Sequence, residues 1–121
     1  MTGTGLSATP EEYRERLDEQ PDEQIDAWAA ELMRDISIRR GVGAVLDGLR
    51  QATGFDDRQL ERLYANGGAP PATAGRTEDG QLLVPAIALH SFVTGLRRQS
   101  PDARALLSEF LVANFHEIVY L

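Results

Sequence analysis

The sequence predicts an all-α fold, a compact bundle of about six short helices. Apolar residues recur at steps of three and four along most of the chain, and helix start and stop signals bound these segments. The length of 121 residues, with 42% hydrophobic and 26% charged residues, suits one soluble globular domain. We expect residues 1–9 to form a disordered N-terminal arm and residues 10–121 to form a single helical domain.

Two helices are predicted before residue 41. The segment Thr9-Pro10-Glu11-Glu12 matches a capping box with proline at the first helical position, and the helix that it opens stops before Pro21. The next helix ends on Arg39-Arg40, whose charges favour the negative end of the helix dipole. It has the clearest amphipathic pattern in the chain, formed by Ile25, Trp28, Ala29, Leu32, Met33 and Ile36.

Glycines and a second capping box bound two further helices. The third helix contains Gly48, which permits the close approach of a neighbouring helix, and it ends at Gly54. Asp56 and Gln59 can cap the start of a fourth helix, which ends at residues 66–68.

Residues 66–81 are rich in Gly, Pro, Ala and Thr and predict one long connection. We interpret it as a flexible connector; a β-ribbon that turns at Asp79-Gly80 and a lid are the alternatives. A fifth helix is predicted over residues 85–98, with Gly95 allowing tight packing.

The last predicted helix, residues 101–121, is apolar on almost every side. Such a helix is either a buried core element or a subunit contact. We therefore expect it in the core or at a dimer interface, where the candidate contact residues are Phe110, Phe115, Ile118, Tyr120 and Leu121.

Two polar residues of this helix, Asn114 and Glu117, fall on its apolar face. Buried polar groups need hydrogen-bond partners, so these two should bond to each other or to an arginine such as Arg39, Arg40 or Arg50. Three interpretations stay open: a structural pair that fixes helix register or dimer geometry, the polar contacts of a small-molecule pocket that includes Trp28, or a frayed helix end at which both residues are solvated.

Several kinds of chemistry are excluded by what the sequence lacks. There is no cysteine and no lysine, which removes disulfides, thiolate metal sites, Schiff-base chemistry and the phosphate-loop lysine. Asp102, Glu109 and His116 form a polar stripe, but a spacing of seven residues separates them by about 10.5 Å, too far for one metal ion. We predict no catalytic residues, no metal site and no cofactor.

The net charge of −7 lies entirely in the first two helices. Between Glu11 and Asp35 there are ten acidic residues and three arginines. A nucleic-acid-binding protein usually has the opposite charge, whereas an acidic helix face fits a basic protein partner. We see no signal peptide, and the longest apolar run, residues 82–89, is too short to span a membrane, so we expect a cytoplasmic protein.

Together these observations predict a non-enzymatic protein–protein interaction or regulatory module, most simply a homodimer. Its partners would be a second copy and a basic protein. Two alternatives stay open. One is a small-molecule-binding protein or small helical enzyme with a pocket near Trp28, Asn114 and Glu117. The other is a winged-helix-like DNA-binding regulator, with residues 42–65 as the helix-turn-helix, Arg58, Arg62 and Asn66 on its recognition helix, and residues 67–84 as the wing.

Overall fold

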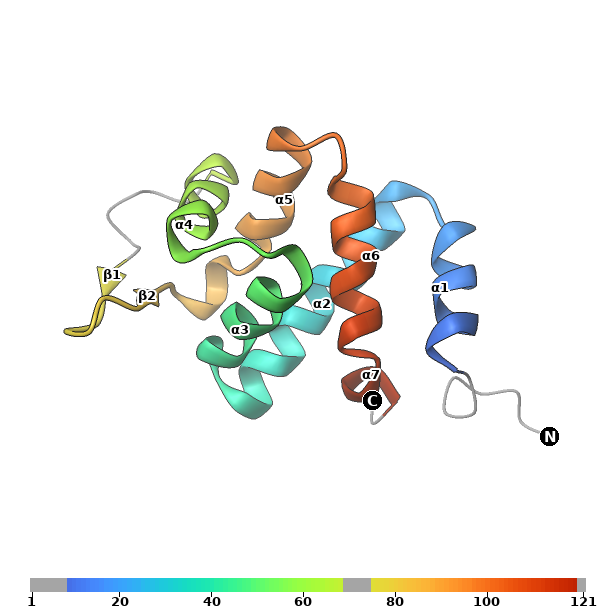
Figure 1. The fold of residues 1–121 in the computed structure, drawn as a ribbon, viewed down its shortest axis with the longest axis horizontal. Coiled ribbons are helices and arrows are strands. Elements are labelled where there is room, and N and C mark those ends of the chain that lie inside the picture. Colours follow the sequence, from blue (N-terminus) through green and yellow to red (C-terminus); the bar gives the residue numbers. More distant parts are fainter. Residues whose placement is uncertain (1–8, 69–74, 120–121) are drawn as a thin grey trace.

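A computed structural model describes residues 9–68 and 75–119 (Figure 1). This part of the chain is helical, with one small two-stranded ribbon, in agreement with the predicted all-α class. The α-helices are α1 (Pro10–Asp18), α2 (Asp22–Arg40), α3 (Val42–Thr53), α4 (Asp57–Asn66), α5 (His90–Gln99), α6 (Ala103–Ala113) and α7 (Phe115–Val119). A 3-10 helix, η3 (Ala86–Ala88), precedes α5, and strands β1 (Gly75–Arg76) and β2 (Leu82–Leu83) pair antiparallel.

Helix α6 lies in the middle of the bundle (Figure 1). It packs against α1, α2, α3 and α5, and α7 follows it directly. Ala103, Leu107, Phe110 and Leu111 of α6 are each at most 1% exposed. The apolar surface of this helix is therefore covered largely by the chain itself, as expected for a core element.

The predicted final helix is two helices, because it breaks at Asn114. The Asn114 side-chain amide donates to the backbone carbonyl of Phe110 at 2.8 Å, and its backbone angles leave the helical range. Asparagine side chains that bond to nearby backbone compete with helix continuation. Residues 120 and 121, part of the predicted helix, lie outside the described residues.

Helices α4 and α5 approach each other closely at two glycines. A Cβ atom on Gly95 would overlap the backbone carbonyl of Leu63, and one on Gly67 would overlap the carbonyl of Ser91. Backbone contact of this kind is possible only where a side chain is missing. The prediction that Gly95 permits tight packing is confirmed.

The predicted helix boundaries are confirmed where capping groups are strong. Thr9 accepts a hydrogen bond from the Glu12 N–H, so that α1 starts as predicted, and the rest of the predicted arm, residues 1–8, lies outside the described residues. Asp56 and Gln59 form both hydrogen bonds of a capping box. Gly54 ends α3 with a φ of 75°.

The interpretation of residues 66–81 as a flexible connector is wrong for residues 75–81. Strand β1 and the turn at Asp79-Gly80 belong to a β-ribbon, which is one of the two alternatives given above. The ribbon is tied to α4 by side chains: Arg76 pairs with Glu61 at 2.6 Å. No helix among the described residues has the length and hydrophobicity needed to cross a membrane.

Candidate interaction site

The predicted partnership between Glu117 and the basic end of α2 is confirmed. Glu117 in α7 is only 6% exposed. Its Oε2 lies 3.1 Å from Arg39 Nη2, and its Oε1 accepts a hydrogen bond from Arg40 Nη1. His116 Nε2 lies 3.5 Å from the same Oε1. The two arginines that end α2 therefore hold α7 through one carboxylate, and both belong to the predicted binding residues.

Asn114 is also buried, yet it does not bond to the Glu117 side chain. Its amide donates to the Phe110 carbonyl, and its own backbone carbonyl accepts from the Glu117 N–H at 2.9 Å. Gly48 of α3 lies beside it: a Cβ there would lie 3.5 Å from Asn114 Nδ2, an ordinary contact, and 3.3 Å from the Phe110 ring, a tight one. Arg50, the third candidate partner, instead binds Asp57 at 2.8 Å.

The fully buried polar atoms have partners within the chain. Among the described residues, every buried side-chain nitrogen and oxygen has a hydrogen-bond partner. Asn114 and Glu117 thus bond to groups of the chain itself, and these bonds fix the positions of the helices that they join. The structure therefore supports the structural interpretation of Asn114 and Glu117.

Trp28 does not join this cluster. It is half-buried and packs against the core. It precedes Arg39 by 11 residues in α2, which corresponds to about 16.5 Å along the helix axis. The structure thus brings Arg39, Arg40, Asn114 and Glu117 to one end of the bundle and leaves Trp28 away from them.

The residues predicted for a dimer interface occupy different environments. Phe110 is fully buried within the chain, so it has no surface to offer to a second copy. Phe115 is half-buried and its ring centroid lies 5.5 Å from that of Tyr13, whose pKa is raised to about 12 by burial. Ile118 is half-buried against the core. Tyr120 and Leu121 lie outside the described residues.

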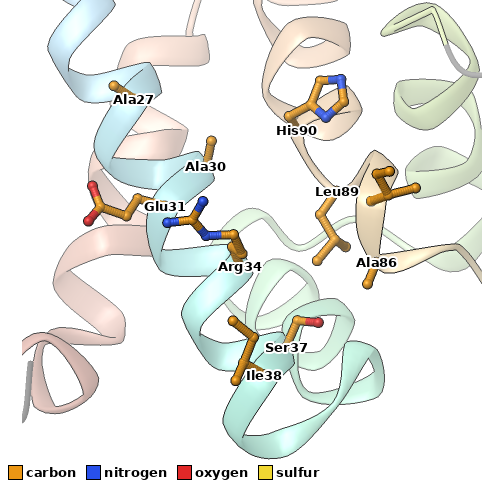
Figure 2. A pocket seen from close by; sticks show the side chains of 10 residues that line it. Ala27, Ala30, Glu31, Arg34, Ser37, Ile38, Ala86, Leu89 and His90 are labelled. Atoms are coloured by element: carbon orange, nitrogen blue, oxygen red, sulfur yellow. The ribbon is translucent and has the colours of Figure 1, made fainter.

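A groove of about 600 Å³ lies between α2 and the segment from η3 to the start of α5. Figure 2 shows side chains of α2 along one side and those of Leu89, His90 and Ala86 across the gap. The groove is lined by Ala27, Ala30, Glu31, Arg34, Ser37, Ile38, Ala86, Ile87, Leu89 and His90. We call it the α2 groove.

Two exposed isoleucines line the α2 groove. Ile38 is 75% exposed and Ile87 is 88% exposed, the two highest values among the large hydrophobic residues that the structure describes. Single exposed hydrophobic residues are common, but two beside one concave surface are typical of a contact site.

Helix α2 forms this groove because it has two faces with different roles. Its core face repeats at Ile25, Ala29, Leu32 and Ile36. At 100° per residue, Ala27, Arg34 and Ile38 point to the opposite side. This second face could not be recognised from the sequence, because its residues are small or charged and give no strong apolar pattern. The isolated Ile38 among polar neighbours was the available signal.

Two opposite charges lie on the groove face of α2. Glu31 and Arg34 are exposed, and in the described part of the chain neither has an ion pair or a hydrogen bond. Other acidic residues near the start of α2 are neutralised internally: Arg97 binds Asp26 at 2.7 Å, and Arg104 binds Asp22 at 2.7 Å. Part of the predicted acidic surface is thus already paired.

A second, smaller hollow of about 170 Å³ lies between α3 and β2. Val42, Leu46 and Leu82 are among its lining residues. Within the described ranges, no group of three or more His, Asp or Glu side chains could hold a metal ion. Trp28, Asn114 and Glu117 line neither hollow.

No known protein family, curated protein or solved structure matches the chain. The candidate site therefore rests on geometry and chemistry alone. On those grounds the α2 groove is the strongest candidate.

The winged-helix alternative finds mixed support. The ribbon follows α4, where a wing was expected, and Arg58 and Arg62 are exposed. However, α4 packs mainly on α5, while α3 packs on α2 and α6. Asn66, the third candidate, uses its amide to bind Gln99 Oε1 at 2.7 Å.

Proposed function

We propose that this protein is a non-enzymatic interaction module that associates with a second copy of itself through the α2 groove. The observation that carries the proposal is the joint exposure of Ile38 and Ile87 at one open groove. Burying apolar surface is the main favourable contribution to most protein–protein association. A homodimer that covers both isoleucines would remove this surface from water.

The chemistry of the groove agrees with association better than with catalysis. Its polar groups are Glu31, Arg34, Ser37 and His90, and all but Ser37 are exposed. Catalytic groups are usually held in a site that excludes water and are oriented by neighbouring side chains. An open groove with solvated charges at its edge is a surface on which a helix can pack.

Sedimentation equilibrium across a wide range of concentrations tests the proposal. The wild-type chain should form a species of twice 13.3 kDa as concentration rises. Ile38→Asp and Ile87→Asp should each raise the dimer dissociation constant roughly tenfold or more, because a carboxylate would be buried in an apolar contact. Both positions are exposed in the free chain, so the helical fold should survive, as circular dichroism would show.

Leu83→Asp is the matched control. Leu83 is 50% exposed on β2 and does not line the α2 groove, so its substitution should leave association unchanged. A wild-type chain that stays monomeric at the highest concentration would contradict self-association. Equal effects of Ile38→Asp and Leu83→Asp would contradict the choice of the groove.

DNA binding is a second candidate, favoured by the ribbon that follows α4. Arg58 and Arg62 would then contact the phosphate backbone from the exposed side of α4. A duplex-binding titration at low salt is the direct test, since phosphate contacts weaken steeply as salt rises. Absence of binding at low salt would remove this candidate.

A further inference from the structure

We infer that the two copies meet through an antiparallel pairing of α2 with α2 of the partner, in which Glu31 of each copy binds Arg34 of the other. This inference rests on the proposed self-association and adds the contact geometry. It starts from the two unpaired charges in the groove, which lie three residues apart on one exposed face.

A twofold axis makes the two charges complementary. In a symmetric dimer, if residue i contacts residue j of the partner, then j contacts i. With the axis midway between positions 31 and 34 of two antiparallel helices, each Glu31 faces an Arg34. Two ion pairs then form from one acid and one base per chain.

The same register matches side-chain sizes at the ends of the contact. Position 27 then faces position 38, so the exposed Ile38 of one copy packs over the small Ala27 of the other. Ala27 and Ile38 both line the groove, and 11 residues separate them, about 16.5 Å of helix. Small residues opposite large ones allow two helices to interlock closely.

The charges favour a second copy over a helix of single charge sign. A strongly basic helix in the groove would attract Glu31 but would place like charges beside Arg34. An acidic helix would reverse the problem. Like charges brought together in an interface are unfavourable. A helix with charges of one sign should therefore bind less well than a helix that carries both signs. A partner that presents one acid and one base at this spacing, as α2 does, satisfies both.

Charge reversal followed by mixing tests the pairing. Glu31→Arg places arginine at both positions, and Arg34→Glu places glutamate at both. Each variant alone should dimerise less well, with a dissociation constant raised by roughly tenfold or more, because all facing charges are alike. An equimolar mixture should form a heterodimer, and the doubly swapped chain, Glu31→Arg with Arg34→Glu, should regain wild-type association. Native mass spectrometry separates the species, since the variants differ in mass.

Two controls show whether net charge alone explains the effect. Glu15→Arg on α1 and Arg62→Glu on α4 change exposed residues outside the groove by the same charge. They should leave the dissociation constant within about twofold of wild type, since distant exposed charges are screened at physiological salt. Circular dichroism should show all variants folded.

The chain contains no cysteine, so its register can also be read by cross-linking. An oxidised mixture of Ala27→Cys and Ile38→Cys chains should give a disulfide-linked heterodimer. Ala27→Cys alone should not cross-link, because the two copies of position 27 would lie at opposite ends of the contact, beyond the Cα separation of about 4.4–6.8 Å that a disulfide requires.

The outcomes separate this inference from the proposed function. Wild-type dimers that tolerate Glu31→Arg and Arg34→Glu would overturn the α2 pairing and leave self-association standing. Disruption by both variants without rescue in the mixture would also overturn it. A wild-type chain that never dimerises would overturn both proposals. Rescue by mixing, together with the 27–38 cross-link, supports the pairing.

Discussion

The contact between Glu117 and the end of α2 predicts that the fold loses different amounts of stability when the carboxylate is removed and when the arginines are removed. Glu117 has a side chain that is 7% exposed, whereas Arg39 and Arg40 are 34% and 54% exposed. In Glu117→Gln the arginines lose their partner but can turn into water. In a chain that carries both Arg39→Ala and Arg40→Ala, the carboxylate stays buried without a guanidinium.

The magnitudes follow from exposure. Half-exposed charged hydrogen bonds contribute less than buried ones, so Glu117→Gln should lower the free energy of unfolding by about 1–2 kcal/mol. Leaving a buried charge without its partner costs more, about 3 kcal/mol or above. Adding Glu117→Gln to the double arginine variant should therefore restore stability, because it removes the stranded charge.

Urea unfolding followed by circular dichroism measures all of these differences. The control is Glu109→Gln, which makes the same chemical change in the ion pair of Glu109 with Arg14. The side chains of this pair are 47% and 46% exposed, so the substitution should lower the free energy of unfolding by less than about 1 kcal/mol. If the double arginine variant is no less stable than Glu117→Gln, or if the triple variant shows no recovery, then the carboxylate is hydrated after all and the reasoning fails.

Two more predictions concern packing and pH. Gly95→Ala should destabilise the fold by about 3 kcal/mol or more, since its methyl group would overlap the Leu63 backbone. In Gly43→Ala the new methyl group meets no atom, so this substitution should stabilise α3 by about 0.5–1 kcal/mol. Thermal unfolding of the two variants compares these effects. Burial raises the pKa of the Asp57 carboxyl, but hydrogen bonds from Arg50 and a backbone N–H together hold it below its ordinary 3.8. A lowered folded-state pKa stabilises the fold above pH 3.8, and this contribution disappears as pH falls through the lower value. Asp57→Asn should therefore flatten the loss of stability on acidification, and an unchanged slope would refute this assignment.

Helix boundaries could be predicted from the sequence where a capping residue or a glycine marks them. The starts of α1 and α4 follow from Thr9 and from the Asp56–Gln59 capping box, and the end of α3 follows from Gly54. The burial of Glu117 could also be predicted, and so could its pairing with arginines, because a carboxylate on an apolar helix face requires a cation. These inferences depend on short-range geometry or on the cost of an unpaired charge.

Features that depend on tertiary contacts could not be predicted in this way. The helix break at Asn114 depends on whether its amide bonds to the Phe110 carbonyl or to another helix. The ribbon depends on contacts to α4, including the bond from the Leu82 N–H to Asp57. The α2 groove exists only because η3 and α5 lie across from α2, which no periodicity in α2 itself reveals.

The ion pairs of α2 affect how the chain folds during synthesis. Its first turns are held by Arg97 and Arg104, and its end is held by Glu117. Every one of these partners is translated more than 55 residues after α2 itself has been made. While the ribosome is still making α3 and α4, the nascent α2 lacks both its charge partners and the cover of α6. We therefore expect stable tertiary structure in this region to appear only after α6 and α7 have left the exit tunnel.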